Sequence, residues 1–190
     1  MTRAFALLFA ALILLAGADH AQAQFDSRDI MGGGPNFFSR GGSSPIQRTT
    51  VSYPTSYSPG TVVVNTAERR LYLVLGNGQA LRYGIGVGRD GFRWSGTHRI
   101  TAKKEWPSWT PPSQMRARRP DLPRHMVGGI ENPLGARAMY LGSTLYRIHG
   151  SNEPETIGQA VSSGCFRMTN DDVTDLYGRV SVGTTVIVKN

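Results

Sequence analysis

The sequence predicts a mainly β domain over residues 60–190, with few helical segments. Short runs of apolar and β-branched residues recur along this part of the chain, as they do in strands. The triplet Gly76-Asn77-Gly78 separates two of these runs and has the composition of a hairpin turn. Helical patterns are confined to two short stretches near the end. We therefore expect one compact domain whose strands are mostly antiparallel.

The expected elements follow one another between short turns. The second of two expected helices would be capped by Asn170, would carry Asp171 and Asp172 in its first turn, and would end near Gly178. The first would cover residues 155–161, just before the only cysteine. The expected strands are 61–65, 70–75, 79–87, 96–105, 138–141, 145–149 and 184–189.

The first residues have the pattern of an export signal. Arg3 is followed by an apolar run over residues 4–17, and Ala21-Gln22-Ala23 has the small-x-small pattern that signal peptidase cuts. The run is short for a membrane span, which needs about 20 residues. We expect a signal peptide over residues 1–23, an exported protein of the periplasm or cell envelope, and no stable membrane span after cleavage. An uncleaved anchor is the alternative.

Residues 24–59 have the composition of a flexible linker. The segments Gly32-Gly33-Gly34-Pro35, Gly41-Gly42-Ser43-Ser44-Pro45 and Ser58-Pro59-Gly60 are rich in residues that resist packing into a core. We expect a Gly/Ser/Pro-rich spacer that holds the domain away from its N-terminal surroundings.

The net charge of +8 bears on the class of partner. For an exported protein it favours anionic envelope polymers or lipid head groups and argues against nucleic acid, although a charged surface also serves solubility alone. There is no His-Glu-x-x-His or Cys-x-x-Cys motif, and the histidines are scattered. We therefore expect no metal and no other cofactor.

Cys165 is the only cysteine of the chain. Exported proteins usually carry cysteines in pairs, so a single thiol is buried and inert, joined to another molecule, or reactive. Its neighbours favour reaction. Gly164 permits close approach of the backbone to a ligand, Ser162 and Ser163 supply hydroxyls, and Arg167 supplies a fixed positive charge.

His149, at the end of an expected strand, is the candidate base. A neighbouring imidazole can take the proton of a thiol, whose ordinary pKa is about 8.5, and leave a thiolate that attacks a carbonyl carbon. Backbone N–H groups around Gly164 and Cys165 would hold the negative oxygen that develops, and the carbonyl of Gly150 is a candidate to orient the imidazole. By itself, one histidine sixteen residues before one cysteine is weak evidence.

Longer strings around these residues are more specific. The segments Tyr146-Arg147-Ile148-His149-Gly150 and Ser162-Ser163-Gly164-Cys165-Phe166-Arg167-Met168 resemble the catalytic signature of the L,D-transpeptidases with a YkuD-type domain. The resemblance extends to Gly96-Thr97-His98-Arg99-Ile100, Asn132-Pro133-Leu134-Gly135 and Val182-Gly183-Thr184-Thr185-Val186, and so spans roughly residues 60–190.

The resemblance implies a YkuD-like β-sandwich, with one or two short helices near the active-site loop, that acts as a peptidoglycan transferase. Such enzymes attack a tetrapeptide stem at the bond between diaminopimelate and D-alanine, form a thioester, pass the acyl group to an amine, and react with carbapenems. Cys165 would be the nucleophile and His149 the proton acceptor and donor. Arg167 and Ser162 match positions that shape the substrate site. Many members have His where this chain has Ser163.

Several functions remain open at this stage. The acyl acceptor could be a second stem peptide, which gives a cell-wall cross-link, or an envelope protein, a free D-amino acid or water. A wall-binding module with a vestigial cysteine, and a cysteine endopeptidase of another fold, are further alternatives. The aromatic segment 106–112 is a lid or an edge loop, and the basic stretch Arg116–Arg124 attracts carboxylates or is simply solvated.

Overall fold

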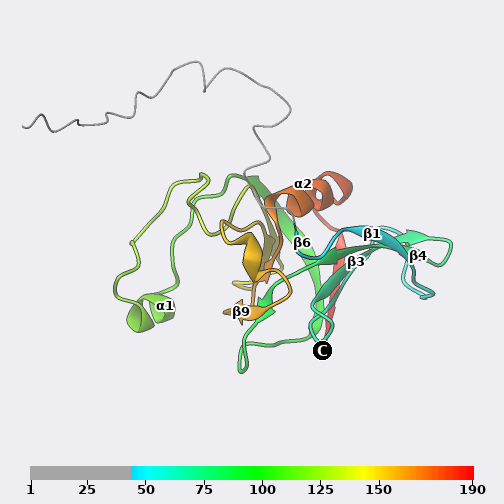
Figure 1. Cartoon of the computed structure of the whole chain (residues 1–190), viewed down its shortest axis with the longest axis horizontal. Helices are drawn as coiled ribbons and strands as arrows, with labels where there is room; N and C mark the ends of the chain where they lie inside the picture. Colours follow the sequence, from blue (N-terminus) through cyan, green and yellow to red (C-terminus); the bar gives the residue numbers. More distant parts are fainter. Residues whose placement is uncertain (1–43) are drawn as a thin grey trace, which may run out of the picture. The chain divides into compact units, whose positions relative to one another are not determined.

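The computed structural model describes residues 44–190, which form a curved sheet with two short helices (Figure 1). The strand order of the main sheet is β1-β4-β3-β2-β11-β6-β7-β8-β10, and β5 pairs with β9 in a separate two-stranded sheet. The elements are β1 (Thr49–Ser52), β2 (Val62–Asn65), β3 (Arg70–Gly76), β4 (Gln79–Gly84), β5 (Val87–Gly88), β6 (Gly96–Glu105), α1 (Ser113–Arg118), β7 (Arg137–Leu141), β8 (Arg147–His149), a 3-10 turn (Pro154–Thr156), β9 (Ala160–Ser162), β10 (Phe166–Arg167), α2 (Asn170–Arg179) and β11 (Thr185–Lys189).

The prediction of a mainly β fold is confirmed, and β6 matches its predicted range at both ends. β3 and β4 form the expected hairpin, with positive φ angles at Gly76, Asn77 and Gly78 of 96°, 52° and 69°. Most strand pairings are antiparallel, as expected. The pairings of β2 with β11, β8 with β10 and β5 with β9 are parallel.

The main core lies between the two halves of the sheet. Tyr83 of β4 and Phe166 of β10 come from strands near opposite ends of the strand order, yet both are buried in the same apolar cluster. Leu176 of α2 joins them. Because strands from both ends of the order share one core, the sheet curls until its halves face each other, as in a sandwich. A smaller cluster around Val63 and Tyr72 covers the outer face of β2 and β3.

Three predicted elements differ from the structure. Residues 155–161 are not a helix, because Pro154 starts only a short 3-10 turn, Gly158 has a φ of 89°, and Ala160–Ser162 pairs with β5 as strand β9. The strand predicted over 79–87 is broken after Gly84. Helix α2 is capped by Thr169 rather than Asn170, since the Thr169 side chain accepts a hydrogen bond from the Asp172 N–H at 3.2 Å.

The predicted linker is also shorter than expected. Thr49–Ser52 forms the edge strand β1, paired antiparallel with β4, so this part of 24–59 belongs to the sheet. The predicted signal peptide over 1–23, its Ala23 cleavage site and the linker up to residue 43 lie outside the described residues. Within residues 44–190, no helix is long and apolar enough to cross a membrane.

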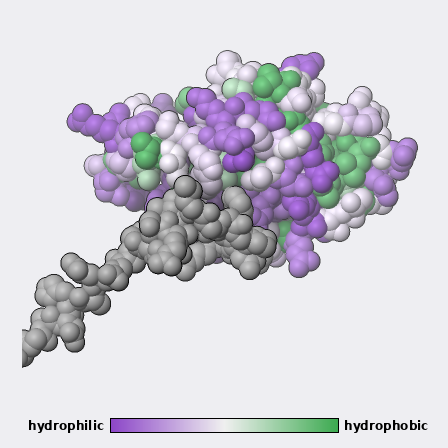
Figure 2. All heavy atoms as spheres, turned by 90° about the horizontal axis from the view of Figure 1, so that it is seen from above, coloured by the Kyte–Doolittle hydropathy of each residue, from purple (hydrophilic) through white to green (hydrophobic). Residues whose placement is uncertain are grey.

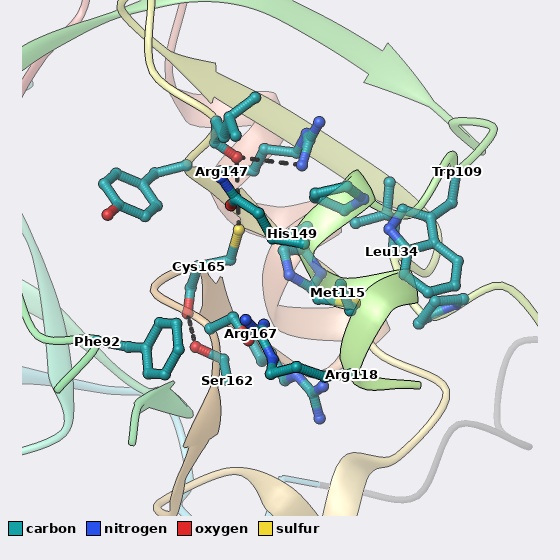
Figure 3. A pocket seen from close by; sticks show the side chains of 16 residues that line it. Phe92, Trp109, Met115, Arg118, Leu134, Arg147, His149, Ser162, Cys165 and Arg167 are labelled. Atoms are coloured by element: carbon teal, nitrogen blue, oxygen red, sulfur yellow. Dashed lines mark hydrogen bonds between the residues drawn. The ribbon is translucent and has the colours of Figure 1, made fainter. Parts of the chain in front are cut away.

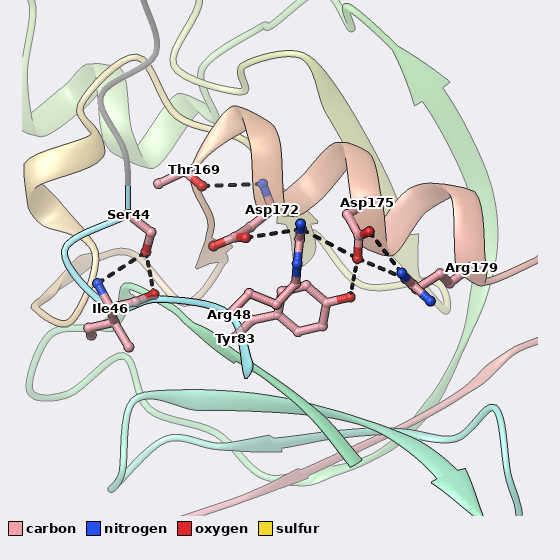
Figure 4. A network of polar contacts seen from close by, with 8 residues as sticks. All are labelled: Ser44, Ile46, Arg48, Tyr83, Thr169, Asp172, Asp175 and Arg179. Carbon is pink, nitrogen blue, oxygen red and sulfur yellow. Dashed lines mark hydrogen bonds and ion pairs between the residues drawn. The ribbon is translucent and has the colours of Figure 1, made fainter. Parts of the chain in front are cut away.

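The segment before β1 is held against α2 by a group of charged side chains (Figure 4). The Arg48 guanidinium lies 3.3 Å from a carboxylate oxygen of Asp172 and 3.4 Å from one of Asp175. Tyr83 donates its hydroxyl hydrogen to Asp175 at 2.6 Å, and Arg179 pairs with the same carboxylate at 2.8 Å. The body of the domain therefore begins before the predicted boundary at residue 60.

The surface view shows polar and apolar residues interspersed (Figure 2). Among the residues described, the large apolar side chains with the highest exposure are Val127, Ile130, Leu145 and Val182. Of these, Leu145 also lines the pocket that holds the predicted nucleophile.

Candidate active site

A pocket of about 330 Å³ lies where β8, the turn after β9 and helix α1 meet (Figure 3). Its lining includes Cys165 and His149, which the sequence placed in one site from their motifs. Ser162, Ser163 and Arg167 line it as well. The parallel pairing of β8 with β10 explains the arrangement, because its register sets Arg167 opposite His149 and Phe166 opposite Ile148. Residues far apart in sequence thus meet at one edge of the sheet.

His149 is the last residue of β8, and its side chain is buried. Its backbone carbonyl accepts a hydrogen bond from Met168 at 2.8 Å, which fixes the main chain. In the ring, Nδ1 lies 2.6 Å from the carbonyl oxygen of Gly150. A carbonyl oxygen only accepts, so Nδ1 must carry the proton and Nε2 of the neutral ring is left as an acceptor. This tautomer is the one that a general base needs.

The turn at Gly150 has no room for a side chain. A Cβ there would collide with Oδ1 of Asn170, and a Cβ at Gly135 would collide with the same atom. Asn170 Oδ1 also accepts a hydrogen bond from the Ala136 N–H at 2.8 Å. Asn170 Oδ1 therefore lies against both glycine turns, and its hydrogen bond with Ala136 fixes the one at Gly135. Its side chain serves this purpose instead of the helix cap predicted for it.

Cys165 is half-buried in the turn between β9 and β10. Ser162 holds that turn in shape, because its hydroxyl donates to the Cys165 carbonyl at 2.6 Å and accepts from the Gly164 N–H at 3.1 Å. Both bonds stay within the protein. The Gly164 N–H, expected to help hold a developing negative oxygen, is thus already bonded, and Ser162 acts on the turn and not through a free hydroxyl.

Gly164 itself is required by geometry. Its φ is 108°, a conformation that L side chains rarely adopt, and a Cβ there would collide with the ring of Tyr146. The thiol of Cys165 lies 3.8 Å from the carbonyl oxygen of Leu145. The residue before the nucleophile is therefore packed directly against the segment that leads into β8.

The environment favours a neutral thiol and a neutral imidazole in the resting protein. Burial, helped by the charges of Arg167 and Arg147, lowers the pKa of His149 to about 3 against the opposing effect of the Gly150 hydrogen bond. Burial raises the pKa of Cys165, although Arg147 and Arg167 partly oppose this shift. The sequence suggested a thiolate made by the imidazole, but these shifts argue against a preformed thiolate–imidazolium pair.

Positive charge dominates the pocket wall. Arg118, Arg147 and Arg167 line it, and no aspartate or glutamate does. Arg167 also forms an ion pair with Glu153, with a distance of 2.9 Å between Nη1 and Oε2. Such a wall suits a ligand that carries carboxylates. Within residues 44–190 there is no group of three or more His, Cys, Asp or Glu that could hold a metal ion.

Some lining residues were not predicted from the sequence. Helix α1 contributes Met115 and Arg118. Arg118 belongs to the basic stretch Arg116–Arg124, for which attraction of carboxylates was one predicted role, but no helix was predicted there. Phe92 lines the pocket from the loop before β6 and packs under the guanidinium of Arg118, whose Cζ is 5.5 Å from the ring centroid. Trp109 also lines it, so the aromatic segment 106–112 reaches the site. No local pattern marks these contacts, because they depend on how distant loops meet.

Known proteins with similar sequences agree on one family. A family model described as the L,D-transpeptidase catalytic domain, YkuD, matches residues 59–188. The chain is 40% identical over 134 residues to the probable L,D-transpeptidase YbiS of Escherichia coli, a match that covers 66% of this chain and 43% of that protein. It is 34% identical over 178 residues to the probable L,D-transpeptidase ErfK/SrfK of E. coli, covering 89% of this chain and 56% of that protein. The chain thus spans about half the length of these relatives.

Solved structures show the same fold. An L,D-transpeptidase from Mycobacterium smegmatis matches with a TM-score of 0.55 at 19% identity, over 68% of this chain and 58% of that one. A Brucella melitensis protein, described as a probable carnitine operon oxidoreductase, is 42% identical with a TM-score of 0.52, over 86% of this chain and 99% of that one. The family model covers most of the chain, and the curated relatives carry the same family name. The chain therefore belongs to the family of the L,D-transpeptidase catalytic domain, YkuD.

Proposed function

We propose that this protein is a peptidoglycan L,D-transpeptidase that uses Cys165 as nucleophile and His149 as general base and acid. The observation that carries the proposal is the shared pocket. It holds one thiol, one neutral imidazole whose Nδ1 proton is bound by the Gly150 carbonyl, and three arginines. The substrate class is a tetrapeptide stem, whose carboxylates suit the positive wall.

The first half-reaction forms an acyl-enzyme. The sulfur of Cys165 attacks the carbonyl carbon of diaminopimelate while Nε2 of His149 takes the thiol proton, so the thiolate forms during attack. The Cys165 N–H stabilises the negative oxygen of the tetrahedral intermediate. The bond to D-alanine then breaks, and His149 returns the proton to the departing amine. A thioester on Cys165 remains.

The second half-reaction transfers the acyl group. An acceptor amine attacks the thioester carbonyl and gives its proton to His149, the carbon–sulfur bond breaks, and the sulfur regains the proton. When the amine belongs to a second stem, the product is a cell-wall cross-link. An amine of an envelope protein, a free D-amino acid or water would follow the same steps. The export signal predicted over residues 1–23 would deliver the protein to the periplasm, where these substrates occur.

The test is a product assay with the purified full chain. Muropeptides are incubated with the wild type, Cys165→Ala, His149→Ala and the control His125→Ala, which changes an exposed histidine outside the pocket. Mass spectrometry identifies the products. We expect no turnover for Cys165→Ala, a loss of about 10²–10⁴-fold for His149→Ala, and near-normal turnover for the control.

Two results would overturn the proposal. Substantial turnover by His149→Ala would show that another group is the base. A wild-type protein that makes no product, and whose Cys165 forms no covalent adduct with a carbapenem, would be a wall-binding module and not an enzyme. Adding a candidate envelope protein, and separately D-amino acids, to the same assay distinguishes the acceptors.

A further inference from the structure

Trp94 contacts the nucleophile turn from a distant part of the chain. It lies in the loop between β5 and β6, about seventy residues before Cys165. Its indole Nε1–H donates a hydrogen bond of 2.7 Å to the carbonyl oxygen of Gly164, the residue just before the nucleophile. None of the motifs that point to the family includes this tryptophan.

Aromatic packing holds the indole ring in place. Trp94 stacks on Tyr146, with ring centroids 4.5 Å apart and planes at 10°. It also contacts Phe166 at 5.3 Å and meets the edge of His98 at 5.2 Å. Phe166 follows the nucleophile directly, and Tyr146 packs against Gly164. A ring fixed on several sides can hold a hydrogen-bond acceptor in one orientation.

The acceptor belongs to the peptide unit that carries the Cys165 N–H. The described residues contain no cis peptide bond, and in a trans peptide the C=O and N–H point in opposite directions. By holding the Gly164 carbonyl, Trp94 therefore also sets the direction of the Cys165 N–H, away from the indole. That N–H makes no backbone hydrogen bond in the part of the chain that the structure describes.

Ser162 complements this contact on the neighbouring peptide units. Its hydroxyl accepts from the Gly164 N–H and donates to the Cys165 carbonyl, so it holds the units on either side of the one that Trp94 holds. Three consecutive peptide planes are thus each fixed by a side chain. The central plane is the one whose N–H would face a negative oxygen at the carbon attacked by Cys165.

We propose that Trp94 is a positioning residue that orients the Cys165 N–H toward the oxyanion of the acyl-transfer reaction, an inference that rests on the proposed function. Trp94 touches neither substrate nor sulfur in this role. It acts through the Gly164 carbonyl, so its effect should be confined to steps in which a carbonyl oxygen becomes negative.

The test compares two reactions of the same thiol. Acylation by a carbapenem passes through an oxyanion, whereas alkylation by iodoacetamide displaces iodide at a saturated carbon and does not. Trp94→Phe keeps an aromatic ring but removes the N–H. We expect acylation to slow about tenfold, less than the 10²–10³ lost when an oxyanion donor is removed outright. Alkylation should stay within about twofold, because Trp94 bonds the Gly164 carbonyl and not the sulfur.

Two further proteins make the test decisive. Trp106→Phe is the matched control, since Trp106 is partly exposed and does not line the pocket, and both of its rates should match the wild type. If Trp94→Phe fails to fold, benzothienylalanine at position 94 keeps the size of the indole and replaces its N–H with sulfur.

Each outcome has one interpretation. Selective loss of acylation supports the role of Trp94. An equal fall of both rates, or no change in acylation, overturns it. A wild-type protein that is alkylated but never acylated overturns the proposed function itself, and the role of Trp94 with it.

Discussion

His149 is buried and uncharged, so the free energy of unfolding should fall as the solution becomes acidic. Replacing this one residue should remove that part of the pH dependence. Burial lowers the pKa of this imidazole from 6.5 to about 3 in the folded protein. Between these values the unfolded chain binds more protons than the folded one, so the free energy of unfolding falls as the pH falls. The limiting slope is about 1.4 kcal/mol per pH unit, and integration from pH 7 to 4.5 predicts a loss of about 2.5 kcal/mol.

His149→Asn isolates this contribution. An asparagine amide can still donate to the Gly150 carbonyl, but it does not titrate. Other groups, including Asp172, whose pKa is raised by burial, titrate in both proteins and cancel in the difference. Urea unfolding at pH 7 and 4.5 gives the four free energies. The wild type should lose about 2.5 kcal/mol more than the variant on acidification. Equal losses would show that His149 is not held neutral by burial.

Three further predictions follow from the geometry. Carbapenem acylation of Cys165 should stay nearly flat from pH 7.5 to 5, because His149, with a pKa of about 3, remains an unprotonated base; a fall centred near pH 6.5 in stopped-flow traces would contradict this. Gly164→Ala should lower the free energy of unfolding by about 2 kcal/mol more than Gly183→Ala, since both have positive φ but only the first would collide with a neighbouring ring; equal thermal shifts would refute the collision. Arg48→Ala should cost about 1 kcal/mol in urea unfolding, a small value because its side chain is 35% exposed; an unchanged midpoint would mean that the N-terminal segment is not anchored by this cation.

Local sequence patterns predicted the framework of the domain well. The Gly76-Asn77-Gly78 turn and the apolar runs beside it are local signals, and the hairpin is present. The end of β8 at His149 agrees with the strand predicted over 145–149, which stops at a glycine. These features depend on neighbours in sequence, which is why they can be read without the fold.

The errors lie where tertiary pairing overrides local preference. Residues 155–161 contain helix-compatible side chains, yet Ala160 pairs with Val87 of β5 as part of strand β9. Asn170 was expected to cap α2, but its side chain lies over Gly150 and the adjacent Thr169 takes the cap. In both cases the deciding partner lies at least twenty residues away in the sequence.

In the candidate site too, local motifs were predicted and tertiary contacts were not. Motif strings were enough to select Cys165 and His149, and both line one pocket. The basic stretch that contains Arg118 was noted from the sequence, but its place in the pocket wall was not predicted, because the contact of Arg118 in α1 with Phe92 joins two segments far from the motifs. The contact of Trp94 with the Gly164 carbonyl is of the same kind, since a single tryptophan in a loop carries no signal of what it binds.

Under the proposed chemistry, the low pKa of His149 bears on both half-reactions. An imidazolium formed in this pocket is a strong acid, so it gives its proton readily to the departing amine and drives the loss of D-alanine. The acceptor amine must then arrive without its proton, because an ammonium has no lone pair. The charges of Arg118, Arg147 and Arg167 disfavour an ammonium in the same space and thereby lower the pKa of an entering amine. A site that is positive and short of acid groups thus favours the neutral amine that attack on a thioester requires.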